Sequence, residues 1–272
     1  MSAGAKRVVI VACTLLLGYA AICALAYFAQ TLLLFPGAGR GDRGLQATPS
    51  RARVEWIEHE GIRTRILVLE SGHAGPLVLY FPGNGEDLAS AARVSEELAD
   101  HACSVLAVEY PGYGASEGSP SMDALLRNAR AAASFAKSLA ARLGVPLCVT
   151  GSSLGTFCAV RAAADGGVWR LLLRAPPTTM ADAARARFWW LPVRMLLRHP
   201  FDNLSPAPGV LCPVLIVHGQ DDRVVAPELG ARLARALPSA RFVLVPGHGH
   251  NDLSLARDGP VGGEIASFLE GP

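Results

Sequence analysis

The first forty residues carry one long apolar run bounded by basic side chains. No charged residue occurs between Arg7 and Arg40, and residues 8–29 are almost wholly apolar. A helix rising about 1.5 Å per residue needs about 20 residues to cross a hydrocarbon core of about 30 Å. Tyr27 and Phe28 fall where an interfacial aromatic belt would lie. The pattern predicts one N-terminal transmembrane helix.

This segment, residues 1–36, could instead be a cleaved signal peptide. Lys6 and Arg7 form a charged N-terminal region, and Ala24-Leu25-Ala26 resembles a small-residue cleavage site. The apolar run continues past that site to Pro36, longer than the hydrophobic region of a signal peptide, which favours a retained anchor. Arginines also follow the helix, but a short basic N-terminal tail usually stays in the cytoplasm. We therefore expect a single-pass membrane protein whose main domain is extracytoplasmic.

From residue 54 onward, short apolar or β-branched runs alternate with Ala- and Leu-rich stretches. The runs that predict strands are residues 54–58, 64–69, 77–81, 104–108, 147–150, 169–174, 214–217 and 242–245. The clearest predicted helices are residues 87–100, 122–143, 154–164, 227–237 and 261–269. This alternation is typical of an α/β fold with a mostly parallel central sheet flanked by helices. We expect one globular domain, residues 37–272.

One segment, at about residues 178–205, interrupts the alternation between two predicted strands. It contains Phe188-Trp189-Trp190, Met195-Leu196-Leu197 and several arginines. This pattern predicts a small helical cap inserted between the strands. The alternative is an ordinary crossover helix whose aromatic side chains pack on the sheet.

Composition adds three limits. Hydrophobic residues make up 51% of the chain and charged residues 18%, a more apolar balance than that of an average soluble domain. The net charge is +2 and the basic residues are scattered, so we expect no nucleic-acid partner. The six cysteines include no CxxC pair and no Cys/His zinc spacing, so we expect no metal and no other cofactor.

The segment Gly151-Ser152-Ser153-Leu154-Gly155 ends a predicted strand and opens a predicted helix. A Gly-x-Ser-x-Gly sequence in this context is typical of a nucleophile elbow. The serine of an elbow occupies a strained turn, and side chains at the two glycines would collide with neighbouring elements. Ser153 is therefore the candidate nucleophile, and an ordinary strand-to-helix turn is the alternative.

Candidate partners for the serine follow the last two predicted strands. Asp221 and Asp222 come after the seventh strand, and His248 and His250 come after the eighth. One carboxylate would orient an imidazole, which would accept the serine proton and return it to the leaving group. The spacing alone leaves open which Asp and which His take these roles.

A pocket for a developing oxyanion needs main-chain N–H donors beside the nucleophile. Leu154 directly follows Ser153, and the Gly-rich turn after the strand at 77–81 exposes amides around Asn84. We expect the N–H groups of Leu154 and Asn84 to form this pocket. The alternative for the turn is a plain loop in which Asp87 caps the following helix.

Together these segments resemble the α/β-hydrolase superfamily, and within it the group with one N-terminal membrane anchor that includes protein depalmitoylases and related serine esterases. The marks of the resemblance are residues 30–36, Phe81-Pro82-Gly83-Asn84-Gly85, residues 109–118, the elbow, residues 218–225 and residues 247–252. The family patterns HGxxDxxV and GxGHND align the acid with Asp222 and the base with His250. Two departures occur, because Pro82 replaces the usual His before Gly-Asn and Glu109-Tyr110-Pro111 replaces the usual Asp-Tyr-Arg.

The residues and the resemblance imply a serine hydrolase that cleaves carboxylic ester or thioester bonds of lipid-like or acylated substrates through an acyl-serine intermediate. A membrane-anchored binding protein that keeps the fold without chemistry is the alternative from another class. A third hypothesis is a metal-dependent hydrolase in which His248, His250 and the two neighbouring aspartates ligate a cation. It requires the serine of the elbow to be coincidental.

Overall fold

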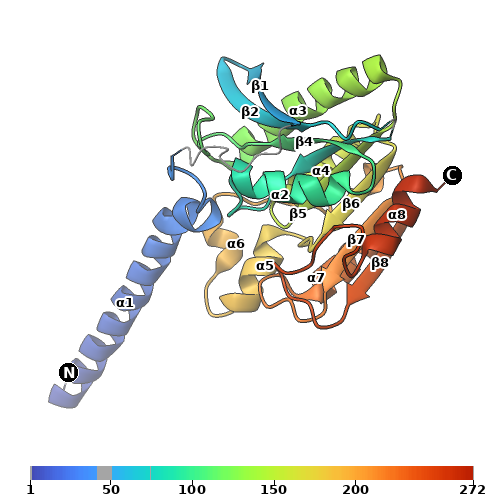
Figure 1. Cartoon of the computed structure of the whole chain (residues 1–272). Helices are drawn as coiled ribbons and strands as arrows, with labels where there is room; N and C mark the ends of the chain where they lie inside the picture. The colour runs from blue at the N-terminus through green and yellow to red at the C-terminus, as the bar shows by residue number, and fades with distance from the viewer. Residues whose placement is uncertain (1, 42–50, 74, 272) are drawn as a thin grey trace.

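A long N-terminal helix projects from an α/β body in the computed structural model, which describes residues 2–41, 51–73 and 75–271 (Figure 1). This helix, α1 (Ala3–Leu34), begins at the N-cap Ser2, whose Oγ accepts a hydrogen bond from the N–H of Ala5 at 3.3 Å. The helix extends beyond the apolar run at 8–29 by five residues at each end. Its most apolar 18-residue window has a mean hydropathy of 2.6 and is unburied, so α1 is long and apolar enough to cross a membrane.

Eight strands form one sheet in the order β1-β2-β4-β3-β5-β6-β7-β8. The strands are β1 (Ala52–His59), β2 (Ile62–Leu69), β3 (Leu77–Phe81), β4 (Ser104–Val108), β5 (Leu147–Ser152), β6 (Arg170–Arg174), β7 (Val214–Gly219) and β8 (Ala240–Val245). Strand β2 is antiparallel to β1 and β4, and the pairs from β4 to β8 are parallel. All eight predicted strands are confirmed, with several ends shifted by one or two residues.

Helices cover both faces of the sheet. They are α2 (Leu88–Ala99), α3 (Met122–Leu143), α4 (Gly155–Ala164), α7 (Pro227–Ala236) and α8 (Gly262–Glu270). Helices α3, α4 and α7 bury Leu125, Phe157 and Leu233 in the core on one face, and α2 and α8 bury Leu98 and Ile265 in the core on the other. The predicted mostly parallel α/β architecture is therefore confirmed.

The alternative for the Gly-rich turn was a loop in which Asp87 caps the following helix, and α2 does begin at this cap. Asp87 is the N-cap of α2, and its Oδ1 accepts a hydrogen bond from the N–H of Ser90 at 2.9 Å. The capping role does not exclude a role for the preceding turn, because the cap uses only the end of the loop.

The insertion between β6 and β7 contains α5 (Met180–Arg187) and α6 (Val193–Leu196), and the 3₁₀ helix η1 (Ala207–Gly209) follows it. We refer to residues 178–205 as the cap. The cap leaves and re-enters the body as paired segments, since the N–H of Met180 donates to Phe201 O and the N–H of Asn203 donates to Thr178 O, both at 2.9 Å. It lies on the side of the body from which α1 projects (Figure 1).

Candidate active site

The segment 151–155 forms a strained turn between β5 and α4. Ser153 has a positive φ of 49°, an unusual conformation for a residue with a side chain. A Cβ on Gly151 would lie 2.7 Å from Gly155 O, and a Cβ on Gly155 would lie 2.0 Å from Phe81 O. Both flanking positions therefore require glycine, which is the physical reason for the Gly-x-Ser-x-Gly pattern.

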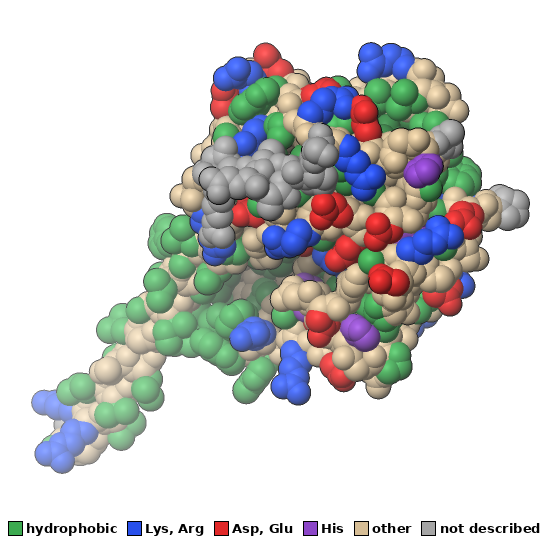
Figure 2. Space-filling model, viewed as in Figure 1, with side chains coloured by type: hydrophobic (Ala, Val, Ile, Leu, Met, Phe, Trp, Pro, Cys, Tyr) green, Lys and Arg blue, Asp and Glu red, His purple; other side chains and the backbone are tan. Residues whose placement is uncertain are grey.

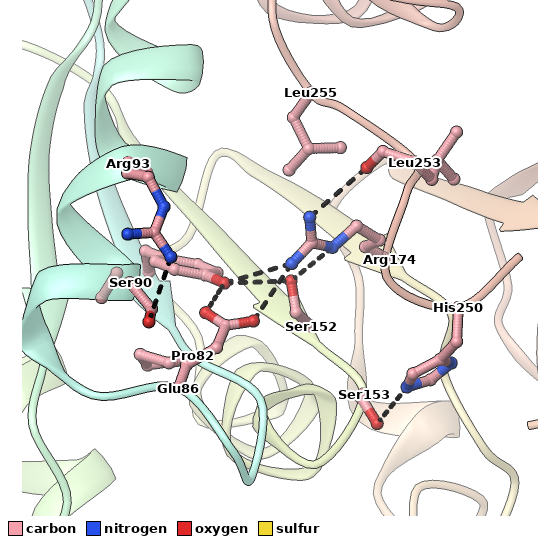
Figure 3. Close-up of polar contacts among 12 residues, drawn as sticks. Pro82, Glu86, Ser90, Arg93, Ser152, Ser153, Arg174, His250, Leu253 and Leu255 are labelled. Carbon is pink, nitrogen blue, oxygen red and sulfur yellow. Dashed lines mark hydrogen bonds and ion pairs between the residues drawn. The ribbon is translucent and has the colours of Figure 1, made fainter. Parts of the chain in front are cut away.

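Loops after β5, β7 and β8 bring Ser153, Asp222 and His250 together. Nε2 of His250 lies 3.0 Å from Ser153 Oγ, and its Nδ1 lies 2.6 Å from Asp222 Oδ2 (Figure 3 shows the first contact). Asp221 is exposed, and Nδ1 of His248 lies 2.9 Å from a main-chain carbonyl of its own turn. Within the described residues, no group of three or more His, Cys, Asp or Glu side chains is arranged to hold a metal ion.

Asp222 is held by donors on both carboxylate oxygens. Its Oδ1 accepts hydrogen bonds from the N–H groups of Val224 (2.8 Å) and Val225 (2.9 Å), and its Oδ2 lies 3.1 Å from Nε2 of the buried His218. Burial alone would raise the pKa of Asp222, but the hydrogen bonds from His218 and His250 outweigh it and hold that pKa below its usual range. Asp222 is therefore a carboxylate at neutral pH. Sequence reasoning assigned His218 no role, and its place beside Asp222 depends on packing.

The Gly-rich turn after β3 lies against the elbow and borders a cavity of about 360 Å³. The residues that line the cavity include Gly83, Asn84, Gly85, Ser153, Ala175, Val224, His250 and Asn251. Among the described residues, no hydrogen-bond acceptor engages the N–H of Asn84 or that of Leu154. The two predicted oxyanion donors are thus free to bind a ligand.

Two tyrosines of the segment 109–118 hold this turn in place. Tyr110 Oη donates to Pro82 O and Tyr113 Oη donates to Asn84 O, each at 2.8 Å. The carboxylate of Glu109, which begins this segment, is buried and accepts two hydrogen bonds of 2.8 Å from the guanidinium of Arg65. Glu109 is therefore paired, and the Pro82 carbonyl has a hydrogen-bond donor in Tyr110.

Sequence reasoning missed a largely buried polar network that lies beside the elbow and borders the cavity. Arg174, at the end of β6, donates from Nε to Ser152 Oγ at 2.9 Å and from Nη2 to Glu86 Oε1 at 3.2 Å (Figure 3). Tyr80 Oη lies 2.6 Å from Glu86 Oε2 and 3.2 Å from Ser152 Oγ. Burial, followed by the Glu86 carboxylate, raises the pKa of Tyr80 well above 10, so the phenol stays protonated. The one signal in the sequence is a lone charge at the end of the apolar run 171–173.

Comparisons with known proteins agree with this architecture. An abhydrolase family model described as TAP-like protein matches residues 194–272. An uncharacterized protein of Mycobacterium tuberculosis is 34% identical over 235 residues, which cover 85% of this chain and 83% of the relative. The chain belongs to the α/β-hydrolase superfamily.

Two further matches describe the relatives of this α/β-hydrolase. The lysophosphatidylserine lipase ABHD12 of Danio rerio is 31% identical over 207 residues, covering 66% of this chain and 49% of that protein. The structure of an esterase from Pyrococcus furiosus has a TM-score of 0.65 at 18% identity, covers 80% of this chain and 90% of its own, and shows the shared fold. The predicted superfamily and fold class are confirmed, and the Danio rerio relative is described as a lipase.

Proposed function

We propose that this α/β-hydrolase is a membrane-anchored serine hydrolase that cleaves carboxylic ester or thioester bonds of acyl-chain substrates. The observation that carries the proposal is the continuous series of contacts from Ser153 Oγ to His250 (3.0 Å) and from His250 to Asp222 (2.6 Å). Ser153 sits on a strained elbow and lines a cavity with Asn84, and Leu154, whose N–H has no acceptor among the described residues, directly follows Ser153. A nucleophile, a base, an orienting acid and an oxyanion pocket are the requirements of acyl transfer.

Acylation begins when Ser153 Oγ attacks the carbonyl carbon of the substrate while His250 Nε2 accepts the hydroxyl proton. The Asp222 carboxylate accepts a hydrogen bond from Nδ1–H and stabilises the imidazolium. The N–H groups of Leu154 and Asn84 donate to the oxyanion that forms on the carbonyl oxygen. His250 then protonates the departing alcohol or thiol, and the acyl group remains on Ser153.

Deacylation repeats these steps with water as the nucleophile. His250 Nε2 accepts a proton from water as the water oxygen attacks the acyl carbon, and the same two N–H groups stabilise the second oxyanion. The bond to Ser153 Oγ then breaks, and Oγ takes the proton from the imidazolium. The carboxylic acid leaves, and the free enzyme is restored.

Features outside the triad support the anchor and the acyl substrate. The unburied helix α1 has the length and hydropathy of a membrane span, and the basic Lys6 and Arg7 at its start favour a cytoplasmic N-terminus. The ABHD12 relative is described as a lysophosphatidylserine lipase. The cap exposes Trp189 and Met195, with exposed fractions of 81% and 85%, beside the helix that would cross the bilayer. An active site outside the cytoplasm that acts on acyl chains fits these features.

The test is labelling of the detergent-solubilised chain with a fluorophosphonate, which reacts with activated serines. We expect the wild type to be labelled and Ser153→Ala to be unlabelled. Ser138→Ala is the matched control, because Ser138 is an exposed serine of α3, and it should be labelled as the wild type is. Hydrolysis of p-nitrophenyl esters of increasing acyl length should follow the same pattern and report the preferred chain length.

The same experiment separates the alternatives. A folded wild type that neither reacts nor turns over would favour the catalytically silent binding protein. Activity that survives Ser153→Ala and disappears with a chelator would favour a metal-dependent hydrolase.

A further inference from the structure

The cap lies alongside α1 and is fixed to it by hydrogen bonds. Gln30 is 8% exposed; its Nε2 donates to Leu196 O at 2.9 Å, and its Oε1 accepts from the N–H of Arg198 at 2.7 Å. Farther toward the N-terminus, Tyr19 Oη donates to Trp190 O at 3.0 Å. These contacts extend over about 16 Å of α1, since each helical residue adds about 1.5 Å.

Because the cap contacts α1 as far down as Tyr19, the whole cap cannot lie in water if α1 spans the bilayer. If the cap region next to Tyr19 were outside the bilayer, only residues 8–18 would remain to cross it, about 16 Å of helix. The hydrocarbon core is about 30 Å thick and needs about 20 residues. Starting after Arg7, such a span reaches Tyr27, which places Tyr19 about 12 Å inside the core. A span shifted toward Leu33 would place Tyr19 deeper still.

The side chains of the cap at this depth suit a lipid environment. Phe188, Trp189, Trp190 and Met195 are exposed by 39%, 81%, 43% and 85%. Figure 2 shows apolar side chains beside α6 that continue the apolar surface of α1, with basic side chains at their edge. Arg198 lies 5.5 Å from the centroid of the Tyr27 ring, at the level of the expected interface, where a cation can reach lipid phosphate.

A groove between α1 and the cap is also apolar. Its volume is about 180 Å³ and its lining is almost wholly apolar. The lining residues include Ala26, Leu33, Leu34, Met180, Phe188 and Leu191. On α1 the groove begins at Ala26, at the expected interface, and continues toward the body to Leu34, so its apolar lining can take up an acyl chain that extends out of the leaflet.

We propose that residues 188–195 of the cap are immersed in the leaflet nearest the hydrolase body and that the groove takes up an acyl chain of a lipid in that leaflet. At that depth no water could donate a hydrogen bond to the Trp190 carbonyl, and the hydroxyl of Tyr19 supplies that donor. The aromatic side chains around it are the membrane contact of a monotopic element beside a single-pass anchor. This proposal rests on the proposed membrane anchor and is independent of the serine chemistry.

The test uses the full chain in lipid vesicles and fluorescence quenching by lipids brominated on the acyl chain. One variant keeps only Trp189, with Trp56, Trp169 and Trp190 replaced by Phe. The control keeps only Trp56, which is 48% exposed on β1, away from α1 (Figure 1). We expect brominated lipid to quench the Trp189 emission and to leave the Trp56 emission unchanged, while aqueous iodide does the reverse.

A second reporter tests the groove. Phe188→Trp in a background without other tryptophans places the fluorophore in the groove lining, and brominated acyl chains should quench it as well. Circular dichroism establishes folding, and if a single-tryptophan variant misfolds, Trp189→Phe with Trp190→Phe in the wild type should remove most quenching by brominated lipid.

Iodide quenching of Trp189 equal to that of Trp56 would overturn the immersion of residues 188–195. Lipid quenching of Trp189 without that of the Phe188→Trp reporter would overturn the acyl chain in the groove. Neither result would affect fluorophosphonate labelling, so a failure here is distinct from a failure of the proposed hydrolase.

Discussion

At the scale of single residues, Asp222 connects the geometry of the candidate active site to the stability of the fold. Its carboxylate is the common acceptor of two imidazoles and two main-chain N–H groups, and its pKa is held below the usual value by those donors against the effect of burial. A group whose pKa is lower in the folded state stabilises the fold fully above its unfolded pKa of about 3.9. This stabilisation is lost as the pH falls toward the folded pKa.

We therefore expect Asp222→Asn to lower the free energy of unfolding by about 2 kcal/mol at neutral pH, because hydrogen bonds to a charged acceptor are lost. The difference from wild type should narrow as the pH falls below about 4. Urea denaturation at a series of pH values measures it. Asp221→Asn, at the exposed neighbouring carboxylate, should change little. A difference that stays constant into acid would contradict the assignment of the low pKa.

A second prediction concerns the ion pair of Arg174 and Glu86, whose side chains are 11% and 22% exposed. Removing one partner leaves the other charge largely shielded from water and unpaired, so Arg174→Met and Glu86→Gln should each destabilise the fold by about 2 kcal/mol. The double variant should lower the free energy of unfolding by at least about 1 kcal/mol less than the sum of the two single-variant effects. The exposed pair of Arg63 and Glu117, at 56% and 41%, is the control for this double-mutant cycle, with a coupling below about 1 kcal/mol. Additive effects at Arg174 and Glu86 would show that the pair is not coupled.

At the scale of elements, the segment that follows α1 contacts a tyrosine that holds the Gly-rich turn after β3. Ala38 forms a β-bridge with Tyr113, and a Cβ on Gly37 would lie 2.3 Å from the Tyr113 ring. The same tyrosine donates to Asn84 O. Tyr113 thus links the end of the anchor to the turn that carries a predicted oxyanion donor.

Tyr113→Phe removes this one hydroxyl and keeps the ring that packs on Gly37. We expect kcat to fall about tenfold, less than the loss of a direct oxyanion donor, with KM nearly unchanged because the turn matters most when charge develops. Steady-state hydrolysis of a short p-nitrophenyl ester measures both constants. Tyr27→Phe in α1 is the control and should retain full activity. A rise in KM at constant kcat would instead indicate that Tyr113 shapes substrate binding.

The local pattern of apolar and polar residues was enough to predict the strands and helices of the fold. Buried strands are short apolar runs, and the elbow needs glycine at 151 and 155 because of contacts that any chain in this turn would make. The network of Arg174 and Glu86 could not be predicted, since it joins the end of β6 to a turn 88 residues earlier. The choice of His250 over His248 likewise required the family pattern, because both follow β8 and only the course of the loop separates them.

At the scale of the whole molecule, the relation between anchor and body depends on contacts that no local pattern records. Gln30 and Tyr19 were polar residues in an apolar run, and their partners lie 166 and 171 positions later in the cap. The apolar run predicted a helix that crosses a membrane, but it did not predict that the cap would lie beside that helix. The cap therefore gives α1 a second connection to the hydrolase body, besides the chain that follows the helix.

The side of the membrane on which this body lies gives the last prediction. Lys6 and Arg7 lie in the first turns of α1, before its apolar run, whereas Arg40, Arg43 and more distant arginines follow the helix. A short N-terminal tail with two basic residues usually stays in the cytoplasm, and we expect these two residues to decide the orientation. We expect an alkaline phosphatase fused to the C-terminus to be active in bacterial cells, and a green fluorescent protein fused there to stay dark. Replacing Lys6 and Arg7 by Glu should invert both results, because the remaining basic residues then lie after the helix. A fluorescent wild-type fusion, with immunoblotting to show equal expression, would place the catalytic domain in the cytoplasm and restrict its substrates to that side.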